Sequence, residues 1–258
     1  MFKETPLYIA ARAVVERIGP GKAFFVGGCV RDALLGHNPK DIDIATELGP
    51  KQIMSLFPGS DLVGADFGVI IVKMLGFHFE VATFRKDGRY LDLRRPESVT
   101  FGTMEDDAKR RDFTINALYY DPFTGEIIDL VGGKKDLEIL SLRCVGNAMD
   151  RFGEDALRIL RAVRFGNRFG LMNEYSLREA AKALAPNLAK LSGERVRDEL
   201  TTILLQPRAD DAMYFMKEWG ILEVLLPEVA RLESCKQSPK HHCAEFTYRK
   251  KIYLDEEN

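Results

Sequence analysis

The chain has 258 residues, of which 46% are hydrophobic and 29% are charged. A chain of this length and composition can bury a core, which excludes a disordered or fibrous protein. The 37 basic residues nearly balance the 39 acidic ones, so the net charge of -2 by itself indicates no nucleic-acid partner. Four irregularly spaced cysteines, no charged-then-apolar leader and no long apolar run predict a cytoplasmic protein without a membrane partner.

The first half of the chain is expected to mix helices with strands. Apolar residues at helical spacing predict a helix over residues 7–18 and a shorter one over 30–35. The stretch 85–105 is polar and aperiodic, so we expect a long loop there. Short apolar or alternating runs predict strands over residues 23–26, 41–44, 69–74, 77–84, 117–120 and 127–131, the third and fourth forming a hairpin about Leu75 and Gly76.

After residue 148 the strand signal disappears and only helical periodicity remains. Helices are expected over residues 154–169, 176–184, 194–205 and 213–219. The predicted fold class is therefore α+β, with a mixed-sheet head domain over residues 1–135 followed by an all-helical neck and partial body over residues 136–232. Residues 233–258 are polar and have no apolar face, so we expect a poorly ordered tail.

Two acids form the first candidate site. Asp41 and Asp43 are separated by one residue of a predicted strand, so their side chains are expected on one face, with Cα atoms about 7 Å apart. Carboxylate oxygens in such a pair suit Mg²⁺, which takes one or two carboxylates together with phosphate oxygens. Glu80, on the second strand of the hairpin, is the candidate third acid. For an isolated Asp-x-Asp, the alternative is a solvated strand face.

Gly27 and Gly28 lie where a predicted strand passes into a helix. Glycine lets a phosphate approach backbone N–H groups, and a helix N-terminus favours negative charge. A Gly-Gly pair alone is a weak signal, and it matches neither the dinucleotide fingerprint nor the P-loop. Followed by an acid pair, it indicates phosphoryl transfer.

The sequence from Gly27 to Gly36, followed by Asp41-Ile42-Asp43, resembles the signature of the bacterial-type (class II) tRNA nucleotidyltransferase and poly(A) polymerase family. Three further blocks resemble motifs of that family: a ribose-reading motif at residues 110–118, a head-to-neck junction at 129–133 and a base-reading helix at 154–161. The resemblance implies a polymerase β-like nucleotidyltransferase head, Mg²⁺ as cofactor, CTP and ATP as substrates, and RNA as partner, in particular the 3′ end of a tRNA.

The same resemblance indicates which side chains meet the nucleotide. Asp112 and Asn116, four residues apart, are expected on one helical face, where they can hydrogen-bond a ribose 2′-hydroxyl. Asp155 accepts and Arg158 donates, which matches the exocyclic amine and ring nitrogen that cytosine and adenine share. The predicted nucleotide-binding residues are Gly27, Gly28, Arg31, Asp32, Arg110, Arg111, Asp112, Asn116, Asp155, Arg158, Arg161 and Arg164.

Their individual positions are predicted as follows. Arg110 and Arg111 should meet the triphosphate, and Arg31 and Asp32 should lie near its end. The alternatives are a surface charge cluster for Arg110 and Arg111, and an ion pair on a solvated helix for Asp155 and Arg158. His37 and His78 are interpreted as ordinary surface or satisfied residues.

These residues predict a template-independent RNA nucleotidyltransferase that uses two metals for in-line attack of an RNA 3′-hydroxyl on an α-phosphate, with release of pyrophosphate. Asp41, Asp43 and Glu80 are the predicted catalytic residues, and Asp41 and Asp43 the metal ligands. Enzymes that add CCA, enzymes that add A alone and poly(A) polymerases share these motifs, so the motifs do not distinguish among the three activities. The motifs also leave open a chain that only binds nucleotide or RNA, and a small-molecule nucleotidyltransferase.

The C-terminal part departs from the family, whose members continue well past this length. Residues 243–258 do not continue the family pattern, so we expect them to be the non-native tail of a truncated or frameshifted gene. The alternative is a zinc site formed by Cys235, His241, His242 and Cys243, although the spacing matches no established finger.

Overall fold

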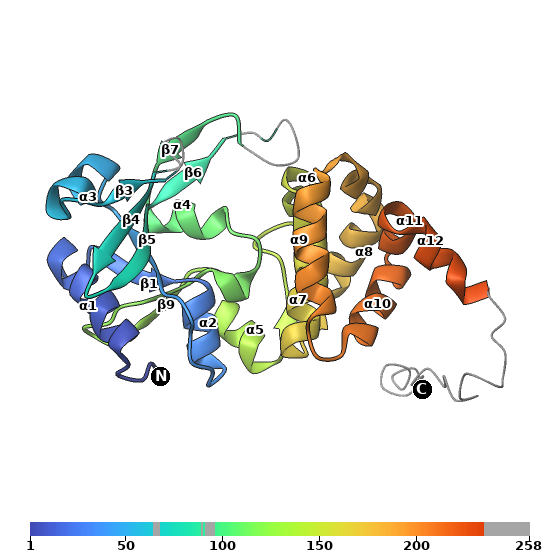
Figure 1. The fold of residues 1–258 in the computed structure, drawn as a ribbon, viewed down its shortest axis with the longest axis horizontal. Helices are drawn as coiled ribbons and strands as arrows, with labels where there is room; N and C mark the ends of the chain where they lie inside the picture. The colour runs from blue at the N-terminus through green and yellow to red at the C-terminus, as the bar shows by residue number, and fades with distance from the viewer. Residues whose placement is uncertain (64–67, 89, 91–95, 235–258) are drawn as a thin grey trace.

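The computed structural model describes residues 1–63, 68–88, 90 and 96–234. Figure 1 shows a sheet flanked by helices in the N-terminal part of the chain and a group of helices in the C-terminal part. The predicted α+β class with a mixed-sheet head is confirmed. The predicted tail and the alternative zinc site fall on residues 235–258, which lie outside the described residues.

A seven-stranded sheet in the order β3-β4-β5-β2-β1-β8-β9 organises the N-terminal part. The neighbours β2 and β5 run parallel and the other neighbouring pairs of this sheet run antiparallel, which makes the sheet mixed. The strands are β1 (Ala23–Val26), β2 (Asp43–Thr46), β3 (Asp61–Leu62), β4 (Val69–Met74), β5 (Phe77–Thr83), β8 (Leu118–Tyr120) and β9 (Ile127–Asp129).

The predicted hairpin is confirmed as β4 and β5, which pair antiparallel from Met74 opposite Phe77 onward. Leu75 and Gly76 connect the strands with φ values of 48° and 83°, the left-handed conformation that a tight hairpin turn needs at both central residues. This hairpin carries Glu80 into the sheet, where β5 lies next to β2.

Helices cover the sheet, and the first of them shows how local sequence forms an element. The side chain of Thr5 caps α1 by accepting a hydrogen bond from the backbone N–H of Tyr8 at 3.2 Å, and Pro6 occupies the first helical position. Gly19 ends the helix, as predicted. The helices of this part are α1 (Pro6–Ile18), α2 (Gly28–Leu34), α3 (Pro50–Leu56), α4 (Met104–Lys109) and α5 (Gly133–Glu138).

The long loop predicted over residues 85–105 is wrong for the described part of that stretch. β6 (Arg85–Asp87) pairs antiparallel with β7 (Val99–Phe101), and α4 begins at Met104. The pairing joins segments more than ten residues apart, so local periodicity could not reveal it. Thr103 and Asp106 form a capping box at the start of α4, a local sequence pattern that does indicate the beginning of a helix.

The helical part begins with α6, and two predictions for it need correction. The helix predicted over residues 154–169 begins only at Leu157, as α7, because Asp155 adopts extended backbone angles of φ -142° and ψ 104° after Glu154, the last residue of α6. A short parallel pair, β10 (Ser141–Leu142) with β11 (Met172–Asn173), interrupts the helices. The helices are α6 (Ala148–Glu154), α7 (Leu157–Phe169), α8 (Tyr175–Leu184), α9 (Gly193–Leu204), α10 (Ala209–Glu218), α11 (Ile221–Leu225) and α12 (Pro227–Ala230), with 3₁₀ turns η3 (Ala185–Lys190) and η4 (Arg231–Ser234).

One hydrophobic core runs from the sheet into the helical part and determines where α7 lies. Phe113, which follows α4, is fully buried and meets Phe165 of α7 edge to face, with ring centroids 5.7 Å apart. This buried contact fixes α7 beside the segment around Phe113, so the polar side chains of α7 next to Phe165 also face that segment.

Candidate active site

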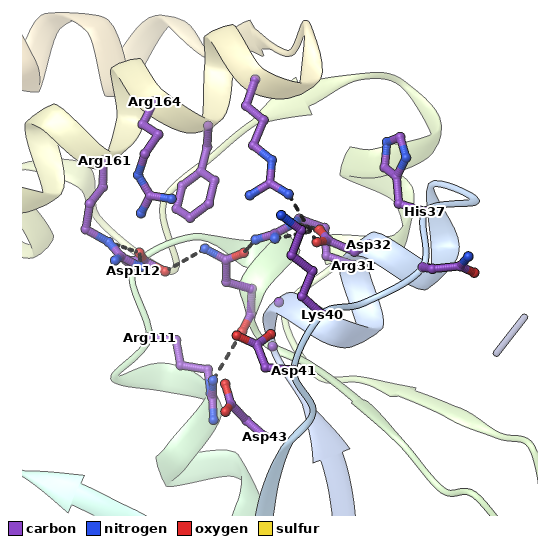
Figure 2. Close-up of a pocket in the computed structure, with 16 residues that line it drawn as sticks. Arg31, Asp32, His37, Lys40, Asp41, Asp43, Arg111, Asp112, Arg161 and Arg164 are labelled. Atoms are coloured by element: carbon purple, nitrogen blue, oxygen red, sulfur yellow. Dashed lines mark hydrogen bonds and ion pairs between the residues drawn. The ribbon is translucent and has the colours of Figure 1, made fainter. Parts of the chain in front are cut away.

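A pocket of about 690 Å³ lies between the N-terminal part and α7. Figure 2 shows acids and arginines from both sides pointing into it. Its lining is Gly27, Gly28, Arg31, Asp32, His37, Asn38, Lys40, Asp41, Asp43, Arg111, Asp112, Asn116, Arg161, Arg164, Phe165 and Arg168. The predicted site residues outside this lining are Glu80, Arg110, Asp155 and Arg158.

The glycine pair forms the floor of the pocket at the end of β1. Gly27 has φ 76° and ψ -124°, a conformation open to glycine, and Gly28 begins α2. A Cβ on Gly27 would lie 3.2 Å from Nη1 of Arg111, and a Cβ on Gly28 would lie 3.5 Å from Nη2 of Arg31. The two glycines therefore let two guanidinium groups approach the backbone of this turn.

Asp41 and Asp43 both line the pocket, although the predicted strand begins two residues later than expected, at Asp43. Both residues are exposed, and Figure 2 shows their carboxylates next to each other beside the guanidinium of Arg111. Desolvation of the carboxyl group within the pocket, followed by the charges of Glu80 and Asp41, raises the pKa of Asp43 to about 6. Negative charge therefore accumulates at this point of the pocket.

Glu80 lies on β5 directly beside the start of β2, because Ile44 pairs with Val81 in the parallel ladder. Its charge reaches Asp43 and contributes to the raised pKa of that carboxyl. The side chain is exposed and lies outside the lining of the pocket. The described residues contain no cluster of three or more candidate metal ligands, so a metal held by Asp41 and Asp43 would take its other ligands from water or substrate oxygens.

Asp112 and Asn116 meet as predicted, but through a different backbone. Phe113 is extended and residues Thr114–Asn116 form the 3₁₀ turn η2, so the two side chains do not share an α-helical face. Nδ2 of Asn116 nevertheless donates to Oδ1 of Asp112 at 3.1 Å. The backbone N–H of Phe113 donates to the same oxygen at 2.7 Å.

Arg110 and Arg111 diverge, and a residue that the sequence analysis missed explains why. Asp107 of α4 is almost fully buried and accepts from Arg110 at 2.5 Å through one oxygen and from Arg111 at 2.8 Å through the other. Burial raises the pKa of Asp107, but the charges of Arg111 and Arg110 outweigh it and the net pKa is lowered. Tyr119 adds a hydrogen bond at 2.7 Å.

Arg110 and Arg111 line different pockets, and their predicted contact with a triphosphate stays a prediction. Arg111 lines the main pocket, whereas Arg110 lines a second pocket of about 280 Å³ together with Lys86, Lys109 and Arg151. The two pockets therefore lie on either side of Asp107. The sequence does carry a signal for Asp107, because it precedes Arg110 by three residues and Arg111 by four, the spacings at which side chains of a helix meet.

Arginines of α7 form the opposite wall. Nε of Arg161 donates to Oδ2 of Asp112 at 2.8 Å, Arg164 pairs with Glu199 of α9, and Arg168 lies 3.4 Å from Oδ2 of Asp32. The ring of Phe165 lies among guanidinium groups, 4.2 Å from that of Arg164 and 5.3 Å from that of Arg161. Phe165 is a lining residue that the sequence analysis interpreted only as part of a helix.

Asp155 and Arg158 lie beside this wall, at the junction of α6 and α7, and outside the lining. Arg158 is buried, so it does not lie on a solvated helix face. Its Nη1 donates to Glu154 at 2.7 Å, and its Nη2 donates to the carbonyl of Arg110 at 3.2 Å. Asp155 accepts from the backbone N–H of Leu157 at 3.0 Å and from Arg195 of α9 at 2.8 Å.

Three lining residues precede the acid pair. The exposed residues Lys40, Asn38 and His37 lie between α2 and β2 and contribute to the lining of the pocket. His37 was interpreted as an ordinary surface residue; it is exposed but also lines the pocket, with its ring 6.4 Å from that of Phe169. Adjacency to Asp41 is the only sequence signal that points to Lys40.

A mixed sheet that presents a glycine turn and an acid pair to a pocket rich in arginine is the arrangement of a nucleotidyltransferase, and the comparisons with known proteins agree. Residues 23–143 match the family described as "Poly A polymerase head domain", and residues 174–232 match "Probable RNA and SrmB- binding site of polymerase A". The chain belongs to the tRNA nucleotidyltransferase and poly(A) polymerase family.

Individual relatives show how far the similarity extends. The chain is 46% identical over 210 residues to a CCA-adding enzyme of Geobacillus thermodenitrificans, which covers 81% of this chain and 52% of the relative. It superposes on the Bacillus stearothermophilus CCA-adding enzyme in complex with CTP with a TM-score of 0.77 at 39% identity, covering 84% of this chain and 53% of that one. For the Thermotoga maritima CCA-adding enzyme complexed with tRNA, the TM-score is 0.68 at 26% identity, with coverage of 90% and 53%.

The chain thus spans about half the length of the curated relatives it matches. Across its described part, every helix is too short or too polar to cross a bilayer.

Proposed function

We propose that this chain transfers C and/or A nucleotides from CTP and ATP to the 3′ end of an RNA, with tRNA as the acceptor. The observation that carries the proposal is a single pocket in which the acid pair, Asp41 and Asp43, faces the Asp112–Asn116 pair and the arginines of α7. The match to CCA-adding enzymes over four-fifths of the chain supports it. The reaction also implies a cytoplasmic location, where tRNA and nucleoside triphosphates meet.

The charges of the pocket suit a nucleoside triphosphate. Its lining contains six cationic residues, Arg31, Lys40, Arg111, Arg161, Arg164 and Arg168, against four acids. Asp32 and Asp112 are each paired with arginine, whereas Asp41 and Asp43 form no ion pair among the described residues. A triphosphate carrying Mg²⁺ complements this distribution, with its phosphates toward the arginines and its metal toward the acid pair.

Asp41 and Asp43 fit the role of Mg²⁺ ligands. No described side chain donates a hydrogen bond to either carboxylate. Desolvation in the pocket, together with repulsion from Glu80 and Asp41, raises the pKa of Asp43, and a cation bound between the two acids would offset that repulsion. Mg²⁺ bound there would neutralise phosphate charge and lower the pKa of the attacking hydroxyl. The proposed chemistry joins the RNA 3′-oxygen to the α-phosphorus and breaks the bond to the leaving pyrophosphate.

The remaining residues would bind and select the nucleotide. Asn116, held by Asp112, would bind the ribose 2′-hydroxyl, and Asp155 with Arg158 would accept and donate hydrogen bonds to the base edge that cytosine and adenine share. We assign the transfer chemistry to residues 1–135 and base and RNA binding to residues 136–232, which the two matched segments support.

An incorporation assay tests the proposal. The chain is incubated with Mg²⁺, one labelled nucleoside triphosphate at a time, and tRNAs that lack one, two or three terminal nucleotides. We expect label from CTP or ATP on these tRNAs, none from GTP or UTP, and none with excess chelator. Stepwise C, C, A products indicate CCA addition, a single A indicates A addition, and a long A ladder on any RNA indicates poly(A) synthesis. Nucleotide binding without incorporation contradicts the proposed transfer.

A further inference from the structure

Arg31 differs from the other arginines of the pocket in its surroundings. Its side chain is 5% exposed, against 34% for Arg161 and 44% for Arg168. Its Nε and Nη2 both donate to Oδ1 of Asp32, at 2.8 and 2.6 Å. A guanidinium group enclosed in this way offers little surface to a phosphate.

Two aromatic rings of α7 complete the enclosure. The guanidinium carbon of Arg31 lies 5.0 Å from the ring centre of Phe165 and 4.6 Å from that of Phe169. The two rings are nearly parallel, with centroids 6.2 Å apart. Contacts of this kind stabilise a planar cation in one orientation. Arg31 is therefore held between Asp32 of its own helix and the aromatic face of α7.

The third nitrogen of Arg31, Nη1, determines the orientation of a neighbouring amide. Nη1 of Arg31 donates to Oδ1 of Asn116. Arginine can only donate, so the amide atom that faces it must be the oxygen. On its other side, the amide nitrogen donates to Asp112, and an ionised carboxylate can only accept. Both neighbours therefore require the same orientation of the Asn116 amide.

This orientation leaves one donor for a hydroxyl group. Asp112 occupies one of the two N–H groups of the Asn116 amide and leaves the second for a ligand. Asp112 accepts from Phe113 and Asn116 through Oδ1, while Nε and Nη2 of Arg161 lie 2.8 and 2.6 Å from its Oδ2, so its acceptor positions are occupied. The free N–H of Asn116 is therefore the group that can donate to a ligand hydroxyl, provided that the plane of the amide is held.

We propose that Arg31 is a positioning residue for ribose recognition rather than a phosphate ligand. Acting through the Asn116 amide, it sets the discrimination between ribonucleoside and deoxyribonucleoside triphosphates. This inference rests on the proposed function, because it requires that a nucleotide binds in this pocket with its ribose at Asp112 and Asn116.

Equilibrium binding of ATP and dATP tests the proposal. Affinities are measured by calorimetry with Mg²⁺ and without RNA, so that no turnover occurs. We expect the wild-type chain to prefer ATP by about tenfold, the value of one good hydrogen-bonding site for a hydroxyl. Arg31→Met should reduce the preference to about twofold by weakening ATP binding, with dATP affinity changed less than about twofold.

Further variants separate positioning from a general structural role. Asn116→Ala should cause the same loss of preference, and the double variant should lose no more than either single one, because both act on one contact. Arg31→Lys keeps the charge beside Asp32 but loses the planar fork that reaches Asn116, so it should also lose the preference while its melting curve stays cooperative. Arg12→Met removes a guanidinium 4.8 Å from the ring of Phe123, away from the pocket, and should leave both affinities unchanged.

Three results have different meanings. Equal weakening of ATP and dATP by Arg31→Met and Arg31→Lys would place Arg31 at the phosphates and overturn the inference. An Arg31→Met variant that keeps the wild-type preference for ATP over dATP overturns the inference as well, while the proposed function stands. A wild-type chain that binds neither nucleotide overturns the proposed function itself, and the inference with it.

Discussion

Nε of Arg161 on α7 lies 2.8 Å from Oδ2 of Asp112, a residue 49 positions away that follows α4. Burial by itself raises the pKa of Asp112, but the charge of Arg161 and the hydrogen bond from Asn116 outweigh burial and bring the pKa to about 2. The pair therefore joins the helical part of the chain to the part that carries the acid pair.

The lowered pKa of Asp112 predicts a pH-dependent contribution to stability. Its pKa falls from 3.8 to about 2 on folding, which corresponds to about 2 kcal/mol of stabilisation above pH 4. A lowered carboxyl pKa contributes stability that is lost as pH falls through the folded value. Asp112→Asn should therefore unfold more easily in urea at neutral pH, and the difference from the wild type should shrink as the pH falls from about 4 to about 2.

Asp198 provides the control for this experiment. It is paired with Arg197 at 2.9 Å, but its side chain is 69% exposed. Asp198→Asn should change the free energy of unfolding by less than about 1 kcal/mol, since exposed pairs are screened by water and salt. A difference between Asp112→Asn and the wild type that stays constant with pH contradicts the prediction.

Replacing either acid of the pair should stop nucleotide transfer without loosening the fold. We expect Asp41→Asn and Asp43→Asn to lower incorporation by about 100-fold or more, because each removes charge that would hold Mg²⁺. Melting temperatures should not fall, since no described side chain donates a hydrogen bond to either carboxylate. Asp61→Asn, an exposed carboxylate on β3 paired with Lys73, is the matched control and should keep full activity. Wild-type turnover in Asp41→Asn would exclude the assignment.

Asp155 should control base selection. An Asn at this position can present either an oxygen or an N–H group, so it can also pair with guanine or uracil edges. Asp155→Asn should reduce the preference in kcat/KM for CTP and ATP over GTP and UTP by about tenfold, within the roughly 1–3 kcal/mol that one base-reading contact is worth. Asp150→Asn, on the exposed side of α6, should leave the preference unchanged. If Asp155→Asn keeps the wild-type preference for CTP and ATP, Asp155 does not select the base.

Gly133 should be intolerant of any side chain. A Cβ there would lie 2.1 Å from the carbonyl oxygen of Thr114, at the start of the turn that carries Asn116. Gly133→Ala should therefore destabilise the chain by about 3 kcal/mol, measured by urea unfolding. Gly153→Ala in α6 meets no atom within 4 Å and should instead stabilise by up to about 1 kcal/mol. Equal changes in the free energy of unfolding for the two substitutions would contradict the predicted clash at Gly133.

Local patterns predicted the elements that local interactions determine. The hairpin of β4 and β5 and the start and end of α1 follow from a two-residue turn, an N-cap and a terminal glycine, all of which act within a few residues. The pairing of β6 with β7 was missed because its hydrogen bonds join distant segments. The start of α7 was predicted three residues too early because apolar spacing does not reveal the extended backbone of Asp155.

By itself, the sequence determined the mixed-sheet and helical architecture, the order of the motif blocks and the family, since motif residues and apolar periodicity are properties of the linear chain. Only the tertiary structure decided which of these residues share a pocket. It separated the neighbours Arg110 and Arg111 around the buried Asp107, and it brought Arg161 to Asp112 and enclosed Arg31 between Asp32 and the rings of α7. These outcomes depend on burial and on long-range pairing of charges, which sequence spacing does not encode.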